Sequence, residues 1–171
     1  MPVYFNVKIY FITLINNTIQ AMNNLNLKTK LFEACKSHQQ KIIANLKAAM
    51  EDAQQSANEY GSPKDRYDSY RMQLLRKKDM FGQQLEKALG EFTILKKIDL
   101  TKTHTTAGFG AVVLTSGQNI FISIGIGKLI VEGKSYYVVS LQVPVCKTLV
   151  GKKKGDITEL KGKEIKINDV F

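Results

Sequence analysis

Two acidic residues three positions apart are the clearest candidates for chemistry in this chain of 171 residues. If Asp65 and Asp68 lie at the start of a helix, both carboxylates project on nearly the same side. Paired carboxylates at an exposed position could help to hold a divalent cation that prefers oxygen ligands, as Mg²⁺ does. The same acids could simply complement the helix dipole at its N-terminus, and spacing alone favours that interpretation.

Ser62 and three tyrosines surround this acidic pair. Ser62 can cap the helix that follows, and with Asp65 three residues on it resembles a capping box. Tyr67 is in register with apolar positions of the same helix, so it is interpreted as packing. Tyr60 and Tyr70 could contact a partner.

Two long helices, folded back on each other within residues 27–98, are predicted to position this tip. Apolar or small residues recur there in steps of three and four that sum to seven, which is typical of a coiled-coil seam. Each arm has roughly thirty residues and would extend on the order of 45 Å. The seam residues are Leu31, Cys35, Ile42, Leu46, Ala49, Ala53 and Ala57 on the first arm, and Tyr67, Leu74, Phe81, Leu85, Ala88, Phe92 and Leu95 on the second.

The pattern changes after the hairpin. Residues 99–107 are polar and Thr-rich and are interpreted as a linker, and residues 108–171 are rich in β-branched and aromatic residues, which favours strands. Antiparallel strands with one short helix predict a small α+β domain. The expected strands are 110–114, 120–124, 128–131, 135–139 and 163–171, and the expected helix is 144–150.

Residues 1–26 are an uncertain N-terminal extension. The apolar run Ile9–Ile15 is too short for a membrane span, which needs about twenty residues, and it lacks the pattern of a signal peptide. The functional part is predicted to begin near Met22.

The formal charge of +10 and the pI near 9.5 indicate an acidic partner, which could be nucleic acid, a membrane surface or an acidic protein. Alternatively, the charge could serve solubility alone. The run Arg76–Lys78 reads first as a solvated helix face and second as a contact for acidic protein or phosphate. Cys35 and Cys146 are interpreted as reduced, small apolar residues, which suits the cytoplasm. His38 and His104 read as surface residues, and no nucleophile arrangement, cofactor loop or metal cluster indicates an enzyme.

The segment 143–156 resembles a known motif. It is similar to the signature S-P-L-A-x-A-L-I-G-K-x-x-G-D in the C-terminal domain of the bacterial Gre transcription elongation factors, and the segment 110–114 resembles their strand G-A-x-V-x-L. The order of hairpin, linker and β domain is also that of the family. The identical positions of the signature are Pro144, Leu149, Gly151, Lys152, Gly155 and Asp156.

This resemblance implies an FKBP-like C-terminal domain, without isomerase function, that docks on RNA polymerase through the signature residues. The hairpin would then enter the secondary channel of the polymerase, where acids at the tip help to bind a second Mg²⁺ that activates water for transcript cleavage. The chain itself would be a cytoplasmic monomer with no cofactor of its own and no membrane partner. DNA or other nucleic-acid contact through the basic surface is a further expectation.

The tip departs from the family pattern. Laid on the family's G-D-L-K-E-N-A-E, Asp65 and Asp68 fall on acids, but Ser62 takes the place of the first one. This favours a Gre-like polymerase binder whose cleavage stimulation is weak or lost. The alternative is a non-catalytic coiled-coil module that binds another protein or nucleic acid.

Overall fold

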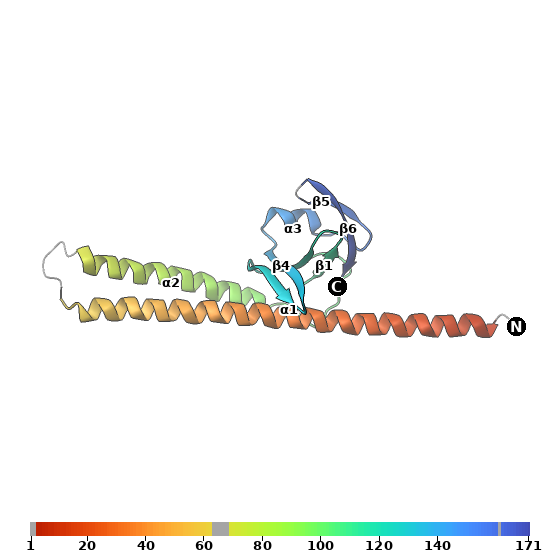
Figure 1. Cartoon of the computed structure of the whole chain (residues 1–171), viewed down its shortest axis with the longest axis horizontal. Coiled ribbons are helices and arrows are strands. Elements are labelled where there is room, and N and C mark those ends of the chain that lie inside the picture. Colours follow the sequence, from red (N-terminus) through yellow and green to blue (C-terminus); the bar gives the residue numbers. More distant parts are fainter. Residues whose placement is uncertain (1–2, 63–68, 161) are drawn as a thin grey trace. The chain divides into compact units, whose positions relative to one another are not determined.

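The computed structural model describes residues 3–62, 69–160 and 162–171 (Figure 1). Two compact units make up the chain: a sheet unit, Met1–Ala34 with Ile98–Phe171, and a hairpin unit, Cys35–Lys97. Within the described ranges the helices are α1 (Val3–Glu59), α2 (Ser69–Leu95) and α3 (Pro144–Leu149), and the strands are β1 (Val112–Thr115), β2 (Asn119–Ser123), β3 (Gly127–Val131), β4 (Lys134–Ser140), β5 (Ile157–Leu160) and β6 (Lys163–Val170).

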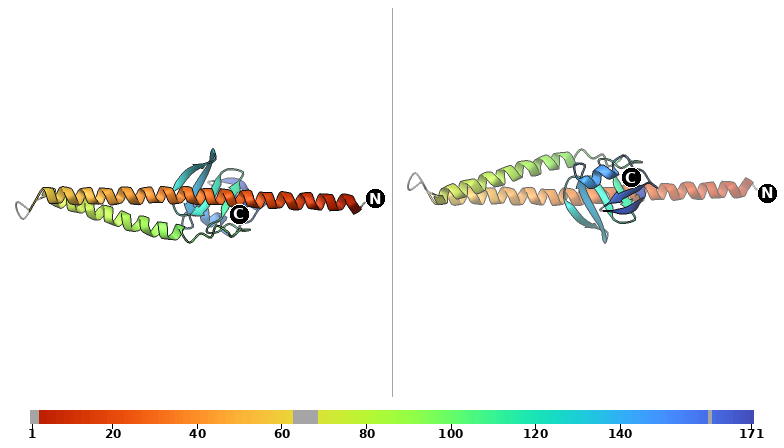
Figure 2. Two further views of the ribbon diagram at one scale, coloured as in Figure 1. Left: turned by 90° about the horizontal axis from the view of Figure 1, so that it is seen from below. Right: turned by 90° about the horizontal axis from the view of Figure 1, so that it is seen from above.

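The hairpin unit consists of the C-terminal half of α1 together with the whole of α2. These two helices lie side by side and run in opposite directions (Figures 1 and 2). Near one end Gln39 Nε2 donates to the Ala88 carbonyl at 2.9 Å. At the other end the Tyr60 and Tyr70 rings are 5.1 Å apart between centroids. The predicted antiparallel helical hairpin is therefore confirmed.

The predicted seam is also confirmed. Its described positions are buried or half-buried, whereas most positions between them are exposed. Small residues at 53, 57 and 88 let the two backbones approach closely. Tyr67, the remaining predicted seam residue, lies outside the described residues. The fully or nearly fully buried seam residues of this unit are Cys35, Ala53, Ala57, Ala88 and Leu95.

Gln39 is a buried polar residue on this seam, and the sequence pattern passed over it. It fills the gap between Cys35 and Ile42 and is only 1% exposed. Besides its bond to Ala88, its amide donates to Glu91 Oε2 at 3.2 Å. A polar residue at a single core position of a coiled coil sets the register at a cost in stability, so Gln39 specifies which turns of the helices face each other.

Helix α1 begins at Val3, well before the predicted start at Leu27, so the described part of the predicted extension is helical. The proposed limits at 26, 98 and 107, and the start of the functional part near Met22, stay predictions.

The sheet unit contains a six-stranded sheet of order β3-β4-β2-β1-β6-β5. Together with α3 it confirms the α+β class. All neighbouring strands pair antiparallel except β2 and β4, which are parallel because β4 inserts between β2 and the edge strand β3. The sequence predicted only antiparallel strands and missed β5, whose four residues, Ile157–Leu160, carry no alternation strong enough to mark a strand.

Both faces of this sheet are buried. On one face Ile120, Ile122 and Ile167 pack with Cys146 and Leu149 of α3. On the other, Phe121 lies opposite Val138 in the β2–β4 register and both are almost completely buried. The burial is not complete at the edge formed by β3 and β4, where Lys128 and Tyr137 are exposed.

Polar side chains in the N-terminal half of α1 contact a strand and a turn of the sheet unit. Lys30 pairs with Glu132 in the β3–β4 turn. Asn24 Nδ2 donates to Asp169 Oδ2 at 3.3 Å, and Asp169 also pairs with Lys154 at 3.2 Å. These contacts make the segment around residues 24–31 of α1 part of the sheet unit.

Gln39→Leu and Gln39→Ala separate the roles of volume and hydrogen bonding in the seam. Gln39→Ala leaves a cavity and is expected to lower the free energy of unfolding by about 1–3 kcal/mol. Gln39→Leu keeps the volume, so we expect a change below about 1 kcal/mol. Urea unfolding of the full chain measures both. If Gln39→Leu is as destabilising as Gln39→Ala, the hydrogen bonds, not the volume, hold the seam.

Candidate docking surface and hairpin tip

Helix α1 ends at Glu59, two residues before Gly61. The Gly61 amide donates to the Asn58 carbonyl at 3.0 Å, and Gly61 has φ +88°. This left-handed conformation suits glycine, which has no Cβ to clash with the carbonyl. Ser62 follows as an exposed bend. Asp65, Tyr67 and Asp68 lie outside the described residues, so their predicted roles stay predictions.

Tyr60 and Tyr70 flank the tip from the two helices. Their rings are tilted by 56° at a centroid distance of 5.1 Å, a favourable geometry for aromatic pairs. Tyr70 remains 54% exposed. The pair therefore joins the two helix ends and still leaves aromatic surface at the tip.

The signature segment begins with α3. Pro144 occupies the first turn of this helix, where its missing N–H costs no hydrogen bond. Cys146 and Leu149 are 0% exposed and form part of the sheet-unit core. Leu149, a predicted docking residue, thus packs in the core, and its docking role stays a prediction.

The turn after α3 requires a glycine. Gly151 has φ +81°, and its amide donates to the Ala107 carbonyl at 2.9 Å. In return the Ala107 amide donates to the Lys152 carbonyl at 2.7 Å. This pair of backbone bonds ties the segment before β1 to the end of α3.

A second tight turn contains Gly155 and Asp156. Asp156 Oδ2 accepts the Lys153 amide at 2.9 Å, and the Asp156 amide donates to the Lys153 carbonyl at 3.1 Å. Gly155 has φ +94° and donates to the Ile167 carbonyl at 2.8 Å. Most of the signature residues therefore build two turns on the sheet unit. Their predicted docking role stays a prediction, and the side chains that the turns display are lysines.

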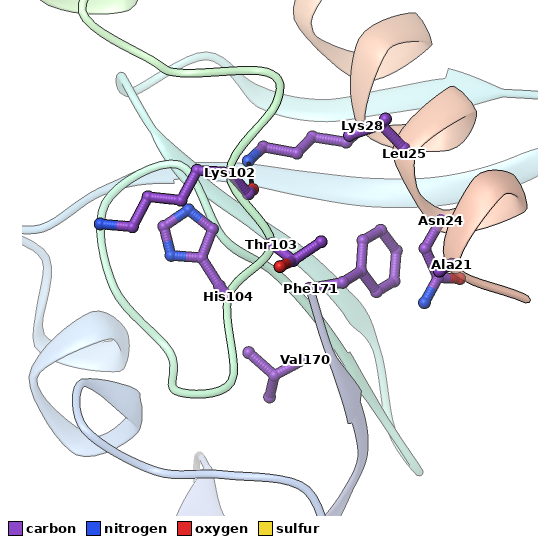
Figure 3. Close-up of a pocket in the computed structure, with 9 residues that line it drawn as sticks. All are labelled: Ala21, Asn24, Leu25, Lys28, Lys102, Thr103, His104, Val170 and Phe171. Carbon is purple, nitrogen blue, oxygen red and sulfur yellow. Dashed lines mark hydrogen bonds between the residues drawn. The ribbon is translucent and has the colours of Figure 1, made fainter. Parts of the chain in front are cut away.

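Lys28 is almost completely buried in the sheet unit, although it is charged at neutral pH in water. Figure 3 shows its side chain reaching from α1 toward the backbone of Lys102. Its Nζ donates to the Asp99 carbonyl at 2.9 Å and to the Lys102 carbonyl at 2.7 Å. Burial lowers the pKa of Lys28, the Asp99 carboxylate opposes this, and the Lys102 ammonium adds to it. Two backbone carbonyls thus compensate in part for the lost hydration of the ammonium group.

A cavity of about 180 Å³ lies beside Lys28 and is lined mainly by apolar atoms (Figure 3). His104, which the sequence places at the surface, is half-buried in its wall. Burial lowers the pKa of His104, and the Lys28 and Lys102 ammonium groups lower it further. The Asp99 carboxylate opposes these effects. No local sequence pattern indicates this arrangement, because it depends on the path of residues 99–104 over α1.

In the described ranges, His, Cys, Asp and Glu side chains form no group of three or more that could hold a metal ion. No helix in these ranges is long and apolar enough to cross a membrane.

No protein-family model matches the chain, and neither does any curated protein. Among solved structures, the chain is similar to GreA factor homolog 1 (Gfh1) of Thermus thermophilus, with 18% identity and a TM-score of 0.31 over 80% of this chain and 94% of that one. A second structure, of the transcription factor Gfh1, gives 15% identity and a TM-score of 0.32 over 79% and 92% of the two chains.

Gly151→Ala is expected to destabilise the chain by about 1–2 kcal/mol, because a Cβ clashes in the left-handed conformation that Gly151 adopts. Nothing lies within 4 Å of the added atom, so the cost comes from the backbone alone. Gly125→Ala is the matched control, since Gly125 has equally open surroundings and no positive φ. We expect the control to leave stability unchanged or raise it by up to about 1 kcal/mol. Equal loss in both variants would contradict a strained turn at Gly151.

Cys146 makes the stability of the chain depend on pH in the alkaline range. Burial raises the pKa of its thiol to about 11, above the value of about 9 in the unfolded chain. The folded protein therefore keeps a proton that the unfolded chain loses, and stability falls from pH 9 to 11. The slope is at most about 1.4 kcal/mol per pH unit. Cys146→Ala should flatten this fall relative to the wild type in urea unfolding. If the wild type and Cys146→Ala lose stability in parallel between pH 9 and 11, burial does not raise the pKa of the Cys146 thiol.

Proposed function

We propose that this chain is a Gre-like regulator of transcription elongation that binds RNA polymerase in the bacterial cytoplasm. The observation that carries the proposal is the hairpin unit, whose seam residues from Cys35 to Ala57 are buried or half-buried and whose described elements are two helices. Twenty-five residues from Cys35 to Glu59, at about 1.5 Å each, hold the tip on the order of 38 Å from the open end of the hairpin. A slender arm of this length suits a narrow channel.

In this proposal the sheet unit docks on the polymerase. Its two signature turns present Lys152, half-exposed, and Lys153 and Lys154, both exposed. Lysines displayed on rigid turns favour an acidic surface on the partner, and such contacts weaken as salt increases. Pro144, at the start of α3, is also exposed.

The tip would reach the catalytic centre of the polymerase without being an enzyme itself. Asp65 and Asp68 supply carboxylate oxygens, which suit Mg²⁺, but two ligands are too few to hold the ion alone. The remaining ligands would come from the polymerase. Because Ser62 stands where the family has its first acid, stimulation of transcript cleavage is proposed to be weak or absent.

The second candidate is a non-catalytic coiled-coil module. It is favoured by the basic helix face at Arg76 and Lys77, both exposed, which could contact another acidic protein or nucleic acid. This candidate predicts a tight partner other than RNA polymerase and no effect of the tip on its binding.

Binding to RNA polymerase is the first test. Tagged full-length chain should retain the polymerase at physiological salt, and Lys152→Glu combined with Lys153→Glu should weaken this retention. Lys163→Glu is the control. Lys163 is the first residue of β6 and lies outside the signature turns, so this variant should have little effect. Failure of the unmodified chain to retain polymerase would eliminate the proposal.

Transcript cleavage by stalled polymerase tests the tip separately. Ser62→Asp restores the missing acid and should increase cleavage above that of the wild type, and Asp65→Ala or Asp68→Ala in this background should abolish the gain. Asp52→Ala removes an exposed acid from the arm and is the matched control. If Asp52→Ala removes the gain equally, net charge and not the tip is responsible.

A further inference from the structure

An open groove of about 390 Å³ lies on the sheet unit beside β3 and β4. Two lysines, Lys128 and Lys134, line it together with the ring of Tyr137, and no acidic residue does. Ser135 and Asn119 add uncharged polar groups.

Strand register places Lys128 next to the ring of Tyr137, whereas Lys134, the first residue of β4, alternates to the other face and lines the groove at the end of the strand. Lys128 of β3 lies directly opposite Tyr137 of β4, and Ile130 lies opposite Ser135. Alternate residues of a strand share a face, so these four side chains project from the same face of the sheet. Tyr137 is 36% exposed and Ile130 is 70% exposed. This edge of the face therefore presents a ring flanked by a lysine.

The far wall of the groove is a turn fixed by one hydroxyl. Thr115 Oγ1 donates to the Gln118 carbonyl at 2.7 Å and accepts the Gly117 and Gln118 amides at 3.2 and 3.0 Å. Asn119 Nδ2 donates to the Ser135 carbonyl at 3.4 Å and joins this wall to β4. The groove is thus formed before any ligand arrives.

The positive charge of the groove is not cancelled locally. The acid nearest to it in sequence is Glu132, in the turn between β3 and β4, and Glu132 pairs with Lys30 of α1. Lys128 and Lys134 are both exposed. An anionic ligand would therefore meet two ammonium groups on the approach to the groove.

We propose that this groove binds a single-stranded nucleic acid, with a base stacked on Tyr137, a neighbouring phosphate paired with Lys128, and the strand continuing past Lys134 at the start of β4. Aromatic side chains on an exposed sheet surface stack unpaired bases, and flanking lysines follow the backbone. An acidic peptide would use the lysines but would gain little from the ring and the amides. A duplex keeps its bases stacked internally and cannot use the ring. The inference does not rest on polymerase binding.

Fluorescence anisotropy of a labelled ten-nucleotide RNA with the full chain tests the proposal. Tyr137→Leu should weaken binding about tenfold or more, whereas Tyr137→Phe keeps the ring and should bind as the wild type. Lys128→Ala should lower the slope of log K against log salt by about 0.7, the share of one phosphate contact on a single strand. Lys163→Ala is the matched control, because Lys163 is exposed on β6 near the opposite edge of the sheet.

Three results would overturn the proposal. They are unchanged binding by Tyr137→Leu, an equal loss of salt slope in Lys163→Ala, and tighter binding of a polyglutamate peptide than of the RNA. Retention of polymerase by Tyr137→Leu is measured in parallel. This measurement distinguishes a failure of the nucleic-acid proposal from a failure of the proposed polymerase binding. Circular dichroism of each variant establishes that it is folded, and Lys128→Ala tests the groove without touching the ring.

Discussion

The burial of the seam between α1 and α2 is the interaction on which the hairpin unit depends. In the part of this unit that the structure describes, α1 and α2 are the only elements, so the stability of the helices there depends on this contact. Alanines at 53, 57 and 88 bring the backbones close but bury little apolar surface. Such a seam defines its register weakly, because neighbouring alanines can replace one another. Gln39 defines the register of the two helices, since its amide has hydrogen-bond partners at only one turn of the facing helix. Register in turn decides which residues meet at the tip, where Tyr60 lies against Tyr70.

Much of the fold could be predicted from the sequence because its signals are local. The seven-residue spacing identifies both arms, Gly61 ends the first arm, and runs of β-branched residues mark β1 to β4 and β6. The missed features depend on contacts distant in sequence. Nothing local to Asn119–Ser123 or Lys134–Ser140 indicates that these strands pair in parallel. Likewise, Lys28 reads as an ordinary surface lysine until residues 99–102 cross over it.

The candidate sites divide in the same way. The signature residues are recognisable in sequence, yet the structure gives most of them a folding role: Leu149 fills the core, Gly151 and Gly155 adopt left-handed conformations, and Asp156 closes a turn. A motif of this kind identifies the scaffold that presents a surface more directly than it identifies the surface. The side chains available for contact are the lysines that the motif holds in place. The groove at Tyr137 cannot be recognised in the sequence for the opposite reason, because its residues come from four strands and a turn and form no motif.

The charge distribution connects these observations. A chain with formal charge +10 is attracted to any polyanion, so charge alone selects no partner. Selection requires fixed geometry around the charges, and the sheet unit supplies it twice, in the signature turns and in the groove beside Tyr137. In the proposed function the two acids that follow the first arm in the sequence, Asp65 and Asp68, act in the complex with the partner. The basic surface would bring the chain to its partner, and the shape of the arm would decide how far the acids reach.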